Sequence, residues 1–202
     1  MYLTEEEKLI LIFYREFYEK DYEPFILENE YSNEINYRHV EVNNTIYILQ
    51  KMGFYTLPYG FEINFKYYGA YSMKLESILN KLDKKEKLIQ DFYNNYEELY
   101  LKVLTYYFDE EHIKILDILK DNLSIFQDFI NMERGLELLV TIIELKKYYL
   151  QNSSFDKINE ELKRKNPLFI NDELNRQAYD ILIKLKIINR DNNLVLKLEK
   201  IV

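Results

Sequence analysis

Residues 61–82 of the chain read Phe-Glu-Ile-Asn-Phe-Lys-Tyr-Tyr-Gly-Ala-Tyr-Ser-Met-Lys-Leu-Glu-Ser-Ile-Leu-Asn-Lys-Leu. Apolar and polar residues alternate from Phe61 to Tyr67, which is the pattern of a half-buried strand. The alternation stops at Gly69, and leucines at helical spacing follow Ser72. The stretch therefore predicts a strand, a tight turn and a helix whose N-cap is Ser72.

Two helices are predicted before this stretch. Thr4 and Glu7 have the spacing of a capping box, which predicts a helix over about 5–20. Apolar residues at helical spacing over 42–52 predict a second helix, and Gly53 is well placed to end it. The order helix, helix, strand, turn, helix resembles that of a winged-helix relative.

The remaining chain is predicted to be largely helical as well. Apolar spacing and capping residues predict helices near 88–108, 109–119, 131–151, 155–165 and 171–185, followed by a β-hairpin near 187–198. Three helices and a hairpin at the end of the chain follow the order of a winged helix-turn-helix.

The predicted fold class is mainly α, with winged-helix-like helical lobes and small β-hairpin elements joined by long helices. Residues 1–108 form an N-terminal helical lobe that holds the strand-turn-helix stretch. Residues 109–202 form a C-terminal lobe similar to a winged helix-turn-helix. No Gly-, Ser- or Pro-rich linker separates the two, so we expect tightly docked lobes or a single domain.

The composition narrows the class of protein. Only four Gly and three Pro occur in 202 residues, which favours helices over turns. The absence of cysteine excludes disulfides, thiolate nucleophiles and Cys-based metal sites. No apolar run reaches the length of about 18 residues that a membrane span needs, and the N-terminus lacks the pattern of a signal peptide. We therefore expect a cytoplasmic protein that does not enter membranes.

The charge is unevenly distributed along the chain. Residues 1–154 carry 17 Lys and Arg against 27 Asp and Glu, whereas residues 155–202 carry ten against eight. An acidic body repels nucleic-acid phosphates unless a local basic face outweighs it. Any contact with nucleic acid is therefore expected in the C-terminal quarter.

The stretch at 68–72, Tyr-Gly-Ala-Tyr-Ser, resembles the Tyr-Gly-Pro-Tyr-Ser signature of YwgA-like proteins, which are relatives of the Panacea antitoxin domain. Ala70 stands where that family carries Pro. Residues 134–139 and 163–188 are similar to the C-terminal half of the same family. The resemblance implies a mostly helical fold of winged-helix type and a neutralising, protein-binding role.

The residues that could support metal binding or catalysis are few. His39 stands in a polar stretch and His112 follows three acids, and both are interpreted as surface residues. Ser72 is interpreted as a helix cap, because no base or Gly-x-Ser-x-Gly pattern accompanies it. Gly69 and Gly135 stand alone and do not form a phosphate loop. We predict no catalytic residue, no metal and no cofactor.

The cations that could contact DNA lie at the end of the chain, and they are also placed to complement the negative ends of helices. They are Lys163, Arg164, Lys165, Arg176, Lys184, Lys186 and Arg190. The predicted helix that would enter a DNA groove begins with Asn171, Asp172 and Glu173, an anionic start that suits DNA poorly.

Four tyrosines near the quoted stretch could anchor a partner protein or lie in the core. They are Tyr55, Tyr59, Tyr68 and Tyr71. The leading hypothesis is a noncatalytic, acidic protein-interaction module that resembles an antitoxin, adaptor or inhibitor and could come from a defence or phage-conflict system. It would bind a toxin, nuclease or effector, and homodimers are a further option. The alternative is a DNA-binding transcriptional regulator, and a metal- or nucleotide-dependent enzyme is a remote third.

Overall fold

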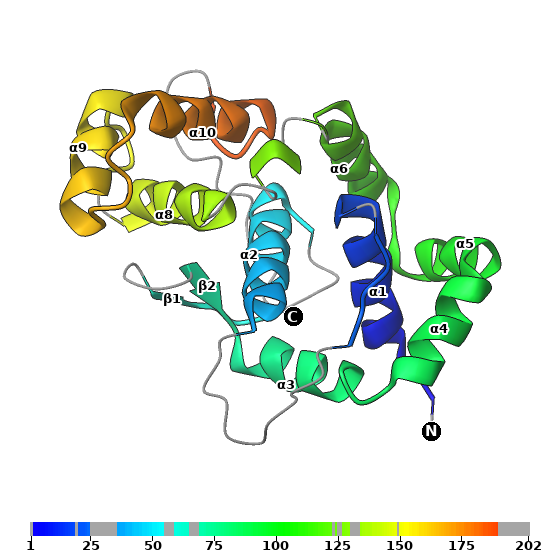
Figure 1. Ribbon diagram of the computed structural model, residues 1–202. Helices are drawn as coiled ribbons and strands as arrows, with labels where there is room; N and C mark the ends of the chain where they lie inside the picture. Colours follow the sequence, from blue (N-terminus) through cyan, green and yellow to red (C-terminus); the bar gives the residue numbers. More distant parts are fainter. Residues whose placement is uncertain are drawn as a thin grey trace, which may run out of the picture.

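The computed structural model describes residues 2–18, 20–24, 36–54, 59–64, 69–122, 124, 127–129, 134–148 and 150–189. Figure 1 shows the arrangement of the chain. The elements are α1 (Glu5–Tyr18), α2 (Tyr37–Met52), β1 (Glu62–Asn64), β2 (Gly69–Tyr71), α3 (Met73–Leu82), α4 (Glu86–Asn94), α5 (Tyr96–Tyr107), α6 (Glu110–Asp121), α8 (Gly135–Tyr148), α9 (Phe155–Lys165) and α10 (Asp172–Lys184).

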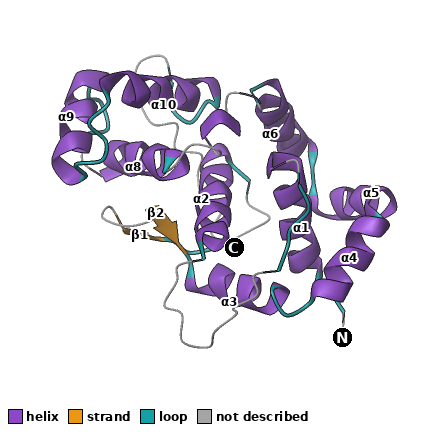
Figure 2. Cartoon of the chain, in the orientation of Figure 1, coloured by secondary structure: helices purple, strands orange, loops and turns teal. Residues whose placement is uncertain are grey.

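The described residues are mainly helical with one small antiparallel sheet, which confirms the prediction of a mainly α fold with a small β-hairpin (Figure 2). The winged-helix likeness of the lobes stays a prediction. β1 and β2 pair so that Glu62 lies opposite Tyr71 and Ile63 opposite Ala70. The sequence predicted a turn at Gly69, but Gly69–Tyr71 is itself a strand. The alternating pattern therefore belongs to a hairpin, and residues 65–68 between its strands lie outside the described part of the chain.

Helix α2 stands in the middle of the molecule (Figure 1). It contacts α3, β2 and α8, and α8 in turn contacts β2, α9 and α10. On the other side, α1 packs on α5, which continues from α4. Elements from 1–108 and from 109–202 thus share an apolar core that includes Ile48 and Leu139.

Helix α8 is buried along nearly its whole length, from Gly135 to Lys146. A helix that is apolar on all sides needs neighbours on all sides, and α2, α9, α10 and β2 supply them. The hydroxyl of Tyr47 on α2 donates a hydrogen bond to the buried carboxylate of Glu144 on α8. None of the helices described here is both long and apolar enough to cross a bilayer.

The capping box at the start of α1 is confirmed. The Thr4 hydroxyl accepts the backbone N–H of Glu7, and the Glu7 carboxylate accepts the N–H of Thr4. The same carboxylate receives the ammonium of Lys85 at 2.6 and 2.7 Å, with both side chains buried. This ion pair fastens the start of α1 to the turn between α3 and α4.

The single helix predicted over 88–108 is wrong, because α4 ends at Asn94 and α5 begins at Tyr96. Asn95 leaves the helical conformation, with φ −115° and ψ 24°. Its side-chain amide donates to the carbonyl of Asp91 and so occupies an acceptor at the end of α4. Asn competes with the backbone in this way more readily than apolar residues do.

Candidate protein-interaction surface

Two asparagines of α2 hold strand β2 in place. Asn44 Oδ1 accepts the backbone N–H of Ala70 at 2.8 Å, and Asn43 Oδ1 accepts that of Ser72 at 2.9 Å. Asn43, Asn44 and Ala70 are all buried. The edge of β2 that faces away from β1 is therefore bonded to α2 and offers no open edge to another strand.

Gly69 is required by this packing. Its φ of +79° lies in the left-handed region that side chains disfavour. A Cβ atom at this position would approach Asn44 Oδ1 to 2.5 Å. The glycine of the 68–72 stretch thus permits the approach of β2 to α2.

Helix α3 starts at the residue that the sequence predicted. The Ser72 hydroxyl accepts the N–H of Leu75 at 3.5 Å, and Ser72 has the extended conformation of an N-cap. Leu75, Leu79 and Leu82 are fully buried on one face of the helix. Ser72 therefore acts as a cap, as predicted.

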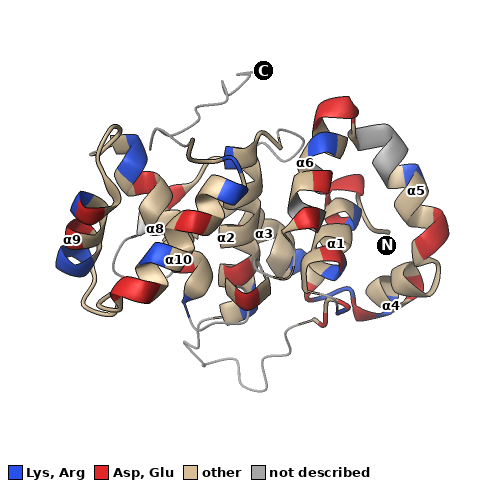
Figure 3. Ribbon diagram, turned by 90° about the horizontal axis from the view of Figure 1, so that it is seen from above, with Lys and Arg blue, Asp and Glu red and all other residues tan. Residues whose placement is uncertain are grey.

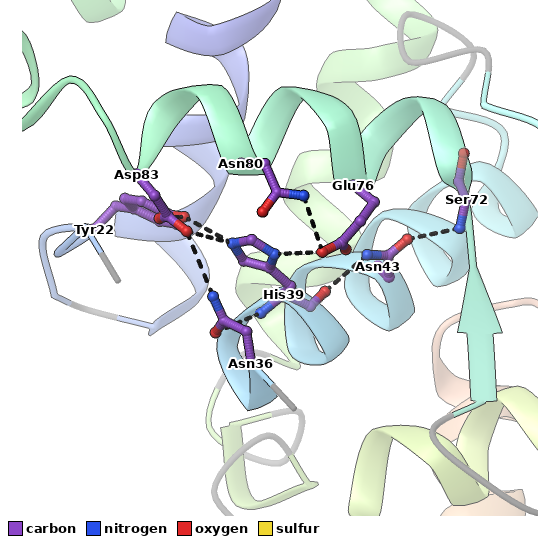
Figure 4. Close-up of polar contacts among 8 residues, drawn as sticks. All are labelled: Tyr22, Asn36, His39, Asn43, Ser72, Glu76, Asn80 and Asp83. Atoms are coloured by element: carbon purple, nitrogen blue, oxygen red, sulfur yellow. Dashed lines mark hydrogen bonds and ion pairs between the residues drawn. The ribbon is translucent and has the colours of Figure 1, made fainter. Parts of the chain in front are cut away.

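His39 of α2 joins α2 to α3, through Glu76 within α3 and Asp83 at its C-terminal end (Figure 4). Its Nδ1 lies 2.7 Å from Glu76 Oε1 and its Nε2 lies 2.9 Å from Asp83 Oδ2. An ionised carboxylate only accepts hydrogen bonds, and a neutral imidazole has a single N–H to donate. Both contacts are satisfied together only by the protonated ring.

The pKa of His39 reflects these contacts. Burial alone lowers it, but the hydrogen bonds and charges of Asp83 and Glu76 outweigh burial and raise the pKa to about 9. Tyr22 donates its hydroxyl to the other Asp83 oxygen at 2.5 Å. Burial and this hydrogen bond raise the pKa of Tyr22, so the phenol stays neutral.

Both histidines were expected at the surface, and that expectation is wrong. His39 lies in the first turn of α2 with an exposed fraction of 3%. His112 is also buried; its ring packs against Phe54 and Phe108, and its Nδ1 lies 2.7 Å from an Asp109 oxygen. Among the described residues no three His, Asp or Glu side chains are grouped to hold a metal ion.

The turn from β2 into α3 exposes two large apolar side chains. Tyr71 is 44% exposed and Met73 is 76% exposed. We call these two residues the β2–α3 corner. Tyr71 is one of the residues predicted to bind a partner, whereas Met73 is not, although its place as the first residue after the N-cap Ser72 was a usable signal.

Of the two places that the sequence allowed for Tyr59, a partner-binding surface or the core, the structure has the core, since its exposed fraction is 5%. Its hydroxyl donates to Glu6 at 2.7 Å, its ring packs near Phe61, and the Lys74 ammonium lies over the ring. A tyrosine whose hydroxyl finds a carboxylate can be buried at little cost. Tyr55, Tyr68, Arg190 and most of the predicted C-terminal hairpin lie outside the described residues.

The cations at the end of α9 are engaged by neighbouring acids. The ammonium of Lys163 pairs with Asp172 at the start of α10. Arg164 pairs with Glu161 at 2.7 Å, and Lys165 is half-buried. Hydrogen bonds from Lys163 and Asn159 lower the pKa of Asp172, as expected for a carboxylate held by donors.

The cations of α10 do not gather into one strip. Arg176 stacks on the ring of Phe155 at 3.6 Å and lies 3.8 Å from an Asp156 oxygen. Lys184 and Lys186 are exposed at the far end of the helix. Those of the predicted DNA-contacting cations that the structure describes are thus divided between the two ends of α10.

A shallow groove of about 570 Å³ lies beside the start of α1. It is lined by Tyr2, Leu3, Thr4, Glu5, Lys8, Leu88, Asp91, Phe92 and Leu99. None of the residues predicted to bind a partner lines it.

Comparisons of the chain with protein-family models, curated proteins and solved structures find no match. The resemblance to YwgA-like proteins therefore stays an expectation from the sequence.

Proposed function

We propose that the protein is a noncatalytic, protein-binding module, similar in role to an antitoxin, adaptor or inhibitor, that docks a partner on the β2–α3 corner. The observation that best supports the proposal is that Tyr71 and Met73 are exposed while the backbone that bears them is held by hydrogen bonds to buried side chains. Asn43 and Asn44 hold β2, and Ser72 caps α3. An anchor on a pre-ordered backbone loses little conformational entropy on binding.

The residue types suit this role. Tyrosine and methionine are enriched at protein interfaces, where they contribute large contact areas. The net charge of −8 favours a partner with a basic surface, because opposite charges speed association and exclude acidic competitors. A toxin, nuclease or effector with a basic groove fits these features.

The experiment begins with a photoreactive amino acid in place of Met73, which captures the partner in cells of the host. The purified partner is then titrated by calorimetry with the wild-type chain, Tyr71→Ala and Met73→Ala. We expect each variant to weaken binding by about tenfold or more, as for central interface anchors. Leu101→Ala on α5 is the control, because Leu101 is 65% exposed, between the values for Tyr71 and Met73, and lies outside the corner.

Equal affinity of the corner variants and the wild-type chain would refute the proposal. The DNA-binding alternative is tested in parallel by titrating duplex DNA at several salt concentrations. Salt-dependent binding that is lost in Lys184→Glu and Lys186→Glu would replace the proposal with a regulator. The ion pairs of Lys163 and Arg164 argue against this outcome.

A further inference from the structure

Four hydrogen bonds join α2 to the start of α3 in a closed cycle, and Figure 4 shows the side chains that take part. Asn43 donates its amide to the His39 carbonyl at 2.8 Å and accepts the backbone N–H of Ser72 at 2.9 Å. The Ser72 carbonyl accepts the N–H of Glu76 at 2.9 Å, and the Glu76 carboxylate lies 2.7 Å from His39 Nδ1. Met73, which follows Ser72, lies in the helical turn that this cycle closes.

Only one bond of the cycle depends on a group that titrates. The other three join amide groups, which keep their donors and acceptors at any ordinary pH. The contact between His39 and Glu76 needs an N–H on Nδ1, because an ionised carboxylate only accepts hydrogen bonds. Since Nε2 lies 2.9 Å from Asp83 Oδ2 as well, the imidazole serves both carboxylates only while it is protonated.

The contact with Glu76 is the one that a neutral His39 would lose. The side chain of Glu76 is 25% exposed, whereas that of Asp83 is 10% exposed. A carboxylate without a donor costs less free energy where water can reach it. The one proton of a neutral imidazole therefore stays on Nε2, toward Asp83, and Glu76 turns to solvent.

The groups that face His39 all favour its charged form at neutral pH. α3 and its C-terminal end bring the carboxylates of Glu76 and Asp83, and the chain before α2 brings the Tyr22 hydroxyl, 3.5 Å from Nε2. The Arg38 guanidinium is separated from the imidazole by the Tyr22 ring, over which it lies at 5.5 Å. Burial lowers the pKa of His39, but the two carboxylates outweigh burial and raise this pKa to about 9.

We propose that His39 is a positioning residue for the β2–α3 corner, and that its proton holds the first turn of α3, with Met73, in the orientation that binds the partner. The inference rests on the proposed function for the binding step alone. When His39 is neutral, the cycle opens at Glu76, while Asp83 keeps the C-terminal end of α3 on α2. The corner then loses a support although the helix remains folded.

The first experiment follows the Met73 methyl group and the His39 imidazole by NMR in the full chain, from neutral pH to beyond the titration of His39. All samples carry Tyr71→Phe, which removes the phenol closest in sequence to Met73. We expect the Met73 signal to shift with the same midpoint as the imidazole signals. The methyl group of Met52, buried at the end of α2, should not follow this titration.

The decisive variant is Glu76→Gln. An amide oxygen accepts from the protonated imidazole and an amide N–H donates to the neutral one, so the cycle stays closed in both states. The Met73 signal should then stay constant while His39 still titrates. The matched control is Glu86→Gln at an exposed position of α4, which should leave the Met73 shift as in the wild-type chain.

Two results would overturn the proposal. One is a Met73 signal that stays constant while His39 titrates in the wild-type chain. The other is an equal Met73 shift in Glu76→Gln or in His39→Gln, since the shift would then come from another group. Circular dichroism at each pH checks that all variants are folded over the range compared.

Calorimetry with the partner captured at Met73 extends the test to binding. The affinity of the wild-type chain should fall about fivefold or more as His39 loses its proton, whereas that of Glu76→Gln should not show this fall. Titrating groups of the partner affect both chains alike. Full affinity of Tyr71→Ala and Met73→Ala would refute the proposed function, and the NMR result would still decide the role of His39. Weak binding by those two variants, with one shared pH profile for the wild-type chain and Glu76→Gln, would refute only the role of His39.

Discussion

The side-chain oxygen of Asn44 accepts a hydrogen bond from the backbone N–H of Ala70 at 2.8 Å, across 26 residues of sequence. This contact, with that of Asn43 to Ser72, joins the central helix to the strand that leads into α3. It explains why two adjacent asparagines stand in the interior of a helix, where asparagine is a poor helix former. The β2–α3 corner depends on both contacts.

Asn44→Ala should lower the free energy of unfolding by about 1–3 kcal/mol, because it leaves the buried N–H of Ala70 without its acceptor. Urea unfolding followed by circular dichroism measures the change. Asn94→Ala, at an exposed position of α4, is the control and should change stability little. Equal stability of the two variants would show that the hydrogen bond from Ala70 to Asn44 does not stabilise the fold.

Gly69→Ala should cost about 2 kcal/mol or more, since the residue has φ +79° and a Cβ atom would press on Asn44. The matched control is Gly60→Ala, where a Cβ atom would meet nothing within 4 Å. In a double-mutant cycle, Asn44→Ala should relieve part of the cost of Gly69→Ala. Strict additivity would show that the two residues do not interact.

The stability of the protein should fall as pH rises past neutrality because of His39. Its pKa is raised from 6.5 to about 9 in the folded state, so its contribution is complete below 6.5 and is lost as pH rises through 9. We expect a contribution of about 1–3 kcal/mol, allowing for screening by solvent. Urea unfolding of the wild-type chain and His39→Gln across this pH range measures it, and parallel pH curves would be the contrary result.

Lys146 should oppose this trend at higher pH. It has no exposed surface, and its ammonium donates to the carbonyl of Ser153 at 2.7 Å. Burial lowers its pKa from 10.5 to about 8, so the unfolded chain binds the proton more tightly and stability rises with pH between these values. Lys146→Met should remove this rise, whereas Lys157→Met at an exposed site of α9 should retain it.

Lys85→Met should destabilise the protein by about 3–5 kcal/mol, because it leaves the buried carboxylate of Glu7 without its cation. The double variant Glu7→Gln with Lys85→Met should be less destabilised than Lys85→Met alone. Lys102→Met breaks an exposed pair with Glu98 and should change stability little. Chemical denaturation of the wild-type chain and these three variants measures the differences, and a double variant less stable than Lys85→Met would exclude the pairing argument.

Much of the secondary structure could be predicted because its signals are local. The caps at Thr4, Ser72 and Asn171 bond to N–H groups within three residues, and the structure has all three. The end of α2 at Gly53 is equally local, since that residue takes a left-handed conformation with φ 104°. The helix break at Asn95 was missed although its signal is also local, since the Asn95 side chain donates to the carbonyl of Asp91 four residues before it.

The candidate surface was predicted only in part. The sequence singled out Tyr71, but the burial of Tyr59 depends on Glu6, 53 residues away. The exposure of Leu168 and Ile170 could not be predicted from the sequence either, because apolar residues such as Leu and Ile are more often buried.

The amino-acid sequence by itself determined that the chain is acidic, because net charge follows from composition. It also determined where helices begin and which faces are apolar, because these follow from neighbours within about one helical turn. Only the tertiary structure decided that α8 is buried between α2, α9, α10 and β2, that His39 lies between two carboxylates, and that Asn43 and Asn44 face β2. These contacts join residues far apart in sequence, and many packings satisfy the same local pattern. The partner of a buried polar group is fixed only when the helices have come together.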